Sequence, residues 1–270
     1  MKKLIAAALA VTMVFSITAC GSKSAETESA KAASGATEGT DVTVSEQSGA
    51  AGGTLVMATN AEFAPYEYHE GDKIVGIDAE IAESIAADLG MELEIQDMAF
   101  DSILASVQTG KADIGVAGMT VTEERLKNVN FTDSYATAAQ VIIINETSDI
   151  QSPDDLAGKI IGVQLGTTGD IYSEDAGAER IERYNKGFEA VQALIQGKID
   201  AVIIDREPAK VFAEQNDGLK ILDEEFTVEE YAIALSKDNE ELLEKINASL
   251  AKLKESGKLQ EIIDKYIKAE

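Results

Sequence analysis

The segment GKADIGVAG, residues 110–118, has a close echo in GKIDAVIID, residues 197–205. Each copy follows an apolar helical pattern and a nearby glutamine, and each predicts a glycine turn that leads from a helix into a buried strand. Gly118 and Asp205 stand at equivalent ends of the two strands. The echo therefore predicts two similar α/β lobes, although a Gly-Lys-x-Asp turn between a helix and a strand can also recur by chance.

The hydrophobic periodicity around each copy supports this organisation. Short apolar runs predict strands, and apolar residues three or four positions apart predict helices. Before the first copy, the pattern predicts a strand at 55–59, a helix at 77–89 that ends at Gly90, a strand at 93–95 and a helix at 100–107. Before the second copy, it predicts a strand at 159–166, a helix after Thr168 and a strand at 180–184. A further helix is predicted through Phe188, Val191, Leu194 and Ile195. After the second copy, residues 238–267 carry two helical stripes. Strands and helices that alternate in this order predict parallel sheets covered by helices.

The size and charge of the chain narrow the classes of function. The chain has 270 residues, of which 45% are hydrophobic, so it is long enough for one or two domains with a substantial core. Its formal net charge of −26 argues against nucleic acid or an anionic membrane surface as a main partner, because both would repel it. The same charge favours a cationic or zwitterionic small ligand over an anionic one.

The N-terminus predicts an exported protein. Two lysines precede an apolar run that is too short to cross a bilayer, so residues 1–19 are expected to be a signal peptide. The run ends in ITAC, which resembles the lipobox of bacterial lipoproteins, and Cys20 is the only cysteine. We expect Cys20 to carry a lipid such as palmitate that holds the protein on the outer face of the cell membrane, and residues 20–53 to form a flexible linker. Ordinary secretory cleavage, which would leave an incidental free thiol, is the alternative.

Few residues suit catalysis or metal binding. His69, the only histidine, falls in the polar turn YHEGDK and is expected to be solvated. The chain has no nucleophile elbow, phosphate loop or calcium loop, so neither a metal nor a cofactor is expected. In GVQLGTTGD, residues 162–170, Gly166 and the two following threonines place donors at a helix start, which predicts either an anion site or a plain capped helix.

The segment GMTVTEERLKNVNF, residues 118–131, places Arg125 in the first turn of a helix capped by Thr120 or Thr122. The helix macrodipole opposes a cation there, so the position needs a reason. With Gly118 and Thr120 just before it, Arg125 predicts a holder for a carboxylate. A surface ion pair with Glu123, Glu124 or Asp133 is the alternative.

Asp205 would supply the other half of such a site. At the end of the second echoing strand it could receive an ammonium group, while Thr168 completes the carboxylate holder. Two facing holders of opposite charge describe a site for a free α-amino acid. The alternative for Asp205 is a loop charge or a helix cap.

Four segments of the sequence together resemble the polar amino-acid-binding family of extracellular solute-binding proteins of ABC importers. They are residues 55–90, 100–135, 162–170 and 200–209, and the GMTxTxxR motif at 118–125 is specific. The resemblance covers nearly all of residues 54–267. It implies a monomeric α/β protein with the two-lobed, periplasmic-binding-protein-like (type 2) fold, in which two hinge strands let the lobes close over a ligand cleft. Lobe 1 would comprise 54–137 with 232–270, and lobe 2 would comprise 138–231.

The resemblance also implies residue roles. The ligand carboxylate would be held by Arg125, by main-chain groups at Thr120 and by the hydroxyl of Thr168, and the ammonium by the Gly118 carbonyl and Asp205. Phe63 and Phe100 would flank the ligand side chain, although each could instead be core. Asn60 stands where many glutamine- and basic-amino-acid-binding members have aspartate, so Glu62 or Gln164 could contact the ligand side chain instead. The expected ligand-binding residues are Asn60, Phe63, Phe100, Gly118, Met119, Thr120, Arg125, Gln164, Thr168 and Asp205.

The implied function is capture of a polar or basic L-amino acid and its delivery to an ABC permease in the membrane, without catalysis. The alternative is an enzyme, because the fold resemblance extends to cyclohexadienyl dehydratase-like proteins; Asp205 or Glu62 would then be the general acid. A receptor sensor domain is not expected, because no transmembrane span follows the last predicted helix.

Overall fold

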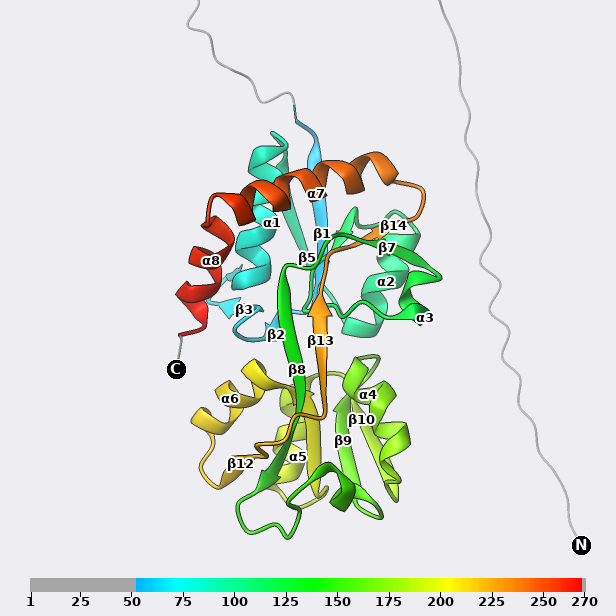
Figure 1. Cartoon of the computed structure of the whole chain (residues 1–270), viewed down its shortest axis with the longest axis vertical. Helices are drawn as coiled ribbons and strands as arrows, with labels where there is room; N and C mark the ends of the chain where they lie inside the picture. Colours follow the sequence, from blue (N-terminus) through cyan, green and yellow to red (C-terminus); the bar gives the residue numbers. More distant parts are fainter. Residues whose placement is uncertain (1–51, 269–270) are drawn as a thin grey trace, which may run out of the picture. The chain divides into compact units, whose positions relative to one another are not determined.

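The computed structural model describes residues 52–268. The expected signal peptide, Cys20 and nearly all of the linker lie outside the described residues. Within them, the chain forms two larger mixed sheets and one small sheet, each larger sheet with its own helices (Figure 1). We call the part built around the five-stranded sheet the first lobe, and the part built around the six-stranded sheet the second lobe.

The first lobe is built on a five-stranded sheet. Its strands, in spatial order, are β5 (Glu92–Asp97), β1 (Thr54–Thr59), β6 (Ile114–Gly115), β14 (Ala234–Ser236) and β7 (Val129–Phe131). The first three strands are parallel, and β14 pairs antiparallel with both of its neighbours. The small sheet consists of β2 (Glu62–Phe63), β3 (Glu67–Glu70) and β4 (Lys73–Val75). The helices are α1 (Ile77–Asp88), α2 (Phe100–Gln108), α3 (Glu123–Leu126), α7 (Glu240–Glu255) and α8 (Lys258–Tyr266).

The second lobe is built on a six-stranded sheet. Its strands, in spatial order, are β10 (Arg180–Tyr184), β9 (Ile160–Gln164), β11 (Ala201–Asp205), β8 (Ala136–Asn145) and β12 (Leu219–Ile221), and β13 (Thr227–Tyr231) also pairs with β8. The helical segments are η1 (Pro153–Leu156), α4 (Thr168–Ser173), η2 (Glu174–Ala176), α5 (Gly187–Ile195) and α6 (Arg206–Gln215).

Two antiparallel strands connect the lobes. The chain leaves the first lobe through β8 and returns through β13, and Figure 1 shows the two strands side by side between the sheets. Tyr231, the last residue of β13, forms an isolated bridge with Thr120 and is fully buried. The connection is therefore a paired ribbon whose upper end is packed into the first lobe.

The sequence echo corresponds to one structural device used twice. Gly110 and Gly197 end α2 and α5 with φ of 69° and 68°, a left-handed conformation that glycine adopts without strain. Three residues further on, each echo places an aspartate beside a neighbouring strand, which is β1 in the first lobe and β9 in the second. The carboxylate of Asp113 accepts a hydrogen bond from the Val56 N–H, and that of Asp200 accepts one from the Ile160 N–H, both at 2.8 Å. The same turn therefore ties the helix-to-strand connection to a neighbouring strand in both lobes.

One helical pattern differs from the sequence expectation. In α5, Phe188 and Ile195 are 39% and 40% exposed, whereas Gly187, Ala190, Val191 and Leu194 are buried. Small side chains on the buried face let the helix approach Gly162 of β9, where an added Cβ would lie 3.2 Å from Ala190.

The two helical stripes predicted at 238–267 form the two helices α7 and α8. Gly257, with φ of 78°, separates them.

Within residues 52–268, no helix combines the length and the apolar character needed to cross a membrane.

Candidate functional site

A cavity lies where the two lobes meet. It is narrow, because the side chains around it leave room for about one water molecule. The lining includes every expected ligand-binding residue except Met119, which is fully buried in a cluster of the first lobe. The lining residues are Asn60, Phe63, Glu67, Phe100, Ala117, Gly118, Thr120, Arg125, Gln164, Thr167, Thr168 and Asp205.

Arg125 turns inward from the single-turn helix α3. Thr122, not Thr120, caps this helix, because its Oγ1 accepts from the Arg125 N–H at 3.2 Å. Arg125 is 7% exposed. Its guanidinium donates to the carbonyl oxygen of Thr120 at 2.7 Å and to that of Gly166, in the second lobe, at 3.0 Å. Its carbon also lies 5.6 Å from the centre of the Phe100 ring. The alternative of a surface ion pair is therefore wrong for Arg125.

The electrostatic surroundings of Arg125 are acidic. Burial lowers the pKa of the guanidinium, and the carboxylates of Glu229 and Asp205 oppose that shift. A guanidinium stays charged at any physiological pH. The cavity therefore contains a permanent cation that is shielded from water.

Asp205 ends β11 and is 6% exposed. Its Oδ1 accepts a hydrogen bond from the Tyr231 hydroxyl, and its Oδ2 accepts one from Gln140 Nε2 at 2.9 Å. Burial raises the pKa of Asp205 to about 7, the bonds from Tyr231 and Gln140 oppose this rise, and the nearby Glu229 adds to it. Asp205 occupies the N-cap position of α6 but makes no capping hydrogen bond, so its side chain is not a helix cap.

Thr168 of the second lobe lines the cavity. The backbone N–H of Gly166, which the sequence offered as an anion donor, is already occupied. Gly166 donates its N–H to Asp170 Oδ2 at 3.0 Å, and Thr167 caps the six-residue helix α4. Of the two predictions for this segment, Gly166 and Thr167 therefore fit the plain capped helix and not the anion site. The hydroxyl of Thr168 lies 2.9 Å from Glu229 Oε2.

Sequence reasoning missed Glu229, a buried residue of β13. The signal that could have found it is the strand period of two. Glu229 shares a face with Thr227 and Tyr231, whereas Val228 and Glu230 are exposed.

Sequence reasoning also missed Glu67, which is 1% exposed and lines the cavity. Burial raises its pKa well above the usual range, and the neighbouring carboxyl of Asp78 adds to the rise. Burial also raises the pKa of Asp78, to about 6, against hydrogen bonds from the Gly118 N–H at 2.8 Å and the Tyr135 hydroxyl at 2.9 Å. This buried acid pair fixes the backbone at Gly118, whose φ of 51° suits glycine.

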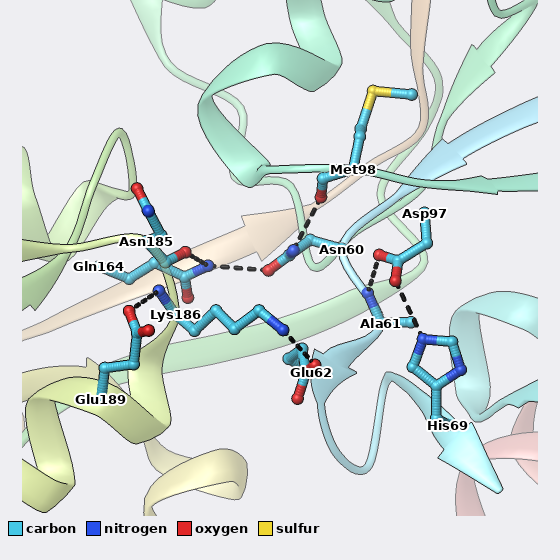
Figure 2. Close-up of polar contacts among 10 residues, drawn as sticks. All are labelled: Asn60, Ala61, Glu62, His69, Asp97, Met98, Gln164, Asn185, Lys186 and Glu189. Atoms are coloured by element: carbon cyan, nitrogen blue, oxygen red, sulfur yellow. Dashed lines mark hydrogen bonds and ion pairs between the residues drawn. The ribbon is translucent and has the colours of Figure 1, made fainter. Parts of the chain in front are cut away.

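Asn60 and Gln164 join the lobes beside the cavity (Figure 2). Asn60 donates to the Met98 carbonyl at 2.8 Å and accepts from Gln164 Nε2 at 2.9 Å. Glu62 does not line the cavity, because its carboxylate pairs with Lys186 of the second lobe. Of the three candidates for a contact with the ligand side chain, Asn60 and Gln164 line the cavity and Glu62 does not.

Phe63 and Phe100 were expected either to flank the ligand or to belong to the core, and both positions are observed for each ring. Phe63 and Phe100 are 8% and 9% exposed, line the cavity and also pack in apolar clusters. Phe63 stacks with Tyr66 at 6.1 Å between ring centres.

His69 lies in β3 and not in a turn. Its Nε2 is 2.9 Å from Asp97 Oδ2 in a half-exposed pair. Among residues 52–268, no three His, Cys, Asp or Glu side chains are grouped to hold a metal ion.

Comparisons with known proteins agree with this geometry. The chain is 34% identical over 276 residues to the arginine-binding extracellular protein ArtP of Bacillus subtilis (strain 168), with 100% of both chains covered. It is 31% identical over 274 residues to the ABC transporter glutamine-binding protein GlnH of the same strain, covering 99% of this chain and 98% of that one. A solved ancestral arginine-binding protein bound to arginine matches with a TM-score of 0.76 and 41% identity, covering 79% of this chain and 98% of that one.

These likenesses confirm the predicted two-lobed α/β fold. The family model of the bacterial extracellular solute-binding proteins, family 3, matches residues 55–269. The chain therefore belongs to the bacterial extracellular solute-binding proteins, family 3.

Proposed function

We propose that this protein captures a free L-α-amino acid between its two lobes and delivers it to an ABC permease in the membrane. The observation that carries the proposal is the pairing of Arg125 with Asp205. One lobe contributes a buried guanidinium and the other a buried carboxyl, and both line the same cavity. A zwitterion carries the two complementary charges.

The acidic surplus of the site favours a basic ligand, and L-arginine is the first candidate. Arg125 is the only basic residue among those that line the cavity, whereas Glu67 and Asp205 are acidic and Glu229 lies just behind. A cationic ligand side chain would reduce this imbalance. The arginine-binding relatives support the same choice.

Opening of the lobes is part of the proposed mechanism. Asn60 and Gln164 are bonded across the lobes, as are Arg125 and Gly166, so the structure represents a closed form. We place the lobe boundaries at 54–137 with 232–270 and at 138–231, so that β8 and β13 act as the hinge. A ligand that contacts both lobes binds the closed form more tightly and shifts the population toward it. Lipidated Cys20 and the following linker would keep the protein near its permease.

The proposed role does not include catalysis. Of the two candidate general acids, Glu62 pairs with Lys186 away from the cavity, and Asp205 is assigned to the ligand ammonium. Conversion of prephenate or arogenate by the purified protein would contradict this part of the proposal.

The test is a calorimetric titration of the purified protein with each of the twenty amino acids. We expect tight one-to-one binding of a basic amino acid and loss of binding in Arg125→Ala. Absence of binding to every amino acid would overturn the proposal. Delivery is tested separately by uptake of the labelled ligand in cells that carry Cys20→Ala, where release of the protein into the medium should reduce uptake.

A further inference from the structure

A short turn of the first lobe carries two of the side chains that reach the second lobe. Residues 60–62 lead from β1 into β2, and the Glu62 N–H donates to the Asn60 carbonyl at 2.8 Å. Asn60 accepts from Gln164, and Glu62 pairs with Lys186 (Figure 2). The position of this turn therefore decides whether both contacts can form when the lobes close.

The end of β5 holds the turn from one side. Met98 donates its N–H to the Thr59 carbonyl at 2.9 Å, and its own carbonyl accepts from the Asn60 amide at 2.8 Å. One residue earlier, Oδ1 of Asp97 accepts from the Ala61 N–H at 3.0 Å. The backbone of Met98 thus holds the start of the turn, and the carboxylate of Asp97 holds its centre.

The Ala61 N–H depends on that carboxylate. Ala61 is 1% exposed and lies beyond Thr59, where the pairing of β1 with β5 ends, so the strand ladder does not supply an acceptor. A buried N–H that loses its acceptor keeps the full cost of its desolvation. If Asp97 lost this oxygen, the turn would have to shift until the Ala61 N–H reached water.

The second oxygen of Asp97 fixes the direction of the first. Oδ2 lies 2.9 Å from Nε2 of His69 in β3, and Figure 2 shows Asp97 between His69 and Ala61. The two paired side chains are 45% exposed for His69 and 36% for Asp97. An ion pair that is so exposed adds little stability by itself. Its effect is to hold the plane of the carboxylate, so that Oδ1 faces the turn.

Asp97 is not among the residues that line the ligand cavity, so it acts on the ligand only through the turn. We propose that Asp97 is a positioning residue for lobe closure, which fixes residues 60–62 so that Asn60 and Glu62 meet the second lobe and thereby slows ligand release. The inference rests on the proposed function, because it concerns release from the same cavity.

The test measures the rates of association and release of L-arginine by stopped flow, or of L-glutamine if arginine does not bind. Asp97→Ala removes the acceptor for the Ala61 N–H. We expect release to become at least about fivefold faster and association to stay within about twofold, because changes at an interface act mainly on dissociation. A general loss of stability would instead lower the fraction of protein that binds and leave the rates of the folded fraction unchanged.

Two variants separate positioning from a loss of stability. Asp97→Asn keeps an oxygen for the Ala61 N–H, and its amide can donate to a neutral His69 ring, so its release rate should stay within about twofold of wild type. Asp113→Ala is the matched control, because it removes a bond of the same kind, from an aspartate to the Val56 N–H of β1. It should also leave the release rate within about twofold of wild type.

An Asp97→Ala release rate within about twofold of wild type, or an equal acceleration in Asp113→Ala, would overturn the inference while the proposed function stands. Asp97→Leu has a similar size and no acceptor, so it replaces Asp97→Ala if that variant does not fold, with the same expected result. Failure of the wild-type protein to bind any amino acid would instead overturn the proposed function, and the inference with it.

Discussion

The lobes are joined by two kinds of contact that differ in their access to water. Inside, Arg125 reaches the Gly166 carbonyl, and Asn60 bonds to Gln164, all among buried or nearly buried atoms. At the edge, Glu62 pairs with Lys186, and their side chains are 32% and 38% exposed. Figure 2 places the Asn60 contact and this edge pair close together in the same view.

The free-energy contribution of a contact between the lobes depends on its burial as well as on its charge. A buried polar group that loses its partner keeps the full cost of its desolvation. An exposed ion pair is weakened by water and by salt. We therefore expect the interior contacts to govern ligand binding and stability, and the edge pair to adjust them slightly.

The largest effect is expected from Arg125→Ala. Removing one partner of a buried, hydrogen-bonded charge pair typically costs about 2–5 kcal/mol of binding free energy. We expect at least a thirtyfold loss of L-arginine affinity by calorimetry. Arg180→Ala is the control, because Arg180 is an exposed residue paired with Glu182. An Arg125→Ala affinity within threefold of wild type would show that the interior cation does not hold the ligand.

The pH dependence of stability tests the buried acids. Burial raises the pKa of Asp205 to about 7, so the folded state holds this proton more tightly than the unfolded chain does. Stability of the unliganded protein is therefore expected to fall as pH rises from about 4 to about 7, by at most about 1.4 kcal/mol per pH unit for this one group. Urea unfolding at a series of pH values measures the slope, and Asp205→Asn should make it shallower. An unchanged slope in the variant would contradict the assignment.

Asn60→Ala is expected to have an intermediate effect. The change leaves the Met98 carbonyl and the Gln164 amide without the partner that they share. Loss of such a partner costs about 1–3 kcal/mol of unfolding free energy. Urea denaturation measures it, with the exposed Asn128→Ala as control. An equal loss of unfolding free energy in Asn60→Ala and in the control would show that Asn60 contributes no more than an exposed contact does.

The smallest effect is expected from the edge pair. Lys186→Ala should change the free energy of ligand binding by about 0.2–1 kcal/mol, as exposed pairs do, and the change should shrink at high salt. Stopped-flow measurement of ligand release at low and high salt tests both points. The double variant Glu62→Lys with Lys186→Glu should restore most of the low-salt rate. A salt-independent loss of more than about 1 kcal/mol of ligand-binding free energy in Lys186→Ala would remove the distinction between edge and interior contacts.

The site could be predicted in part, because some of its residues stand in local patterns. Arg125 was recognisable from its position in the first turn of a helix, where a cation needs a partner elsewhere. Glu67 had no such signal, and Glu229 had only the strand period of two, which places it on the face of Tyr231 but does not assign it a partner. An acidic residue in a strand is ordinarily expected to face water. Only packing against Asp78 and against Thr120 and Thr168 gives them a role.

By itself, the sequence determined the repeated unit. The glycine turn depends only on the local backbone conformation at Gly110 and Gly197, so GKADIGVAG and GKIDAVIID specify the same turn in both lobes. The hydrogen bonds of Asp113 and Asp200 form only when a neighbouring strand packs beside that turn. The 3.6-residue and two-residue periods then place the helices and strands around it.

Tertiary structure alone decided which groups meet. Glu229 Oε2 lies within hydrogen-bonding distance of Thr120, Gln140 and Thr168, which lie far from one another in the sequence. Burial at that meeting point, which no local pattern encodes, raises the pKa of Asp205. Such properties depend on what surrounds a residue in space, and a linear sequence does not record distances across a cavity.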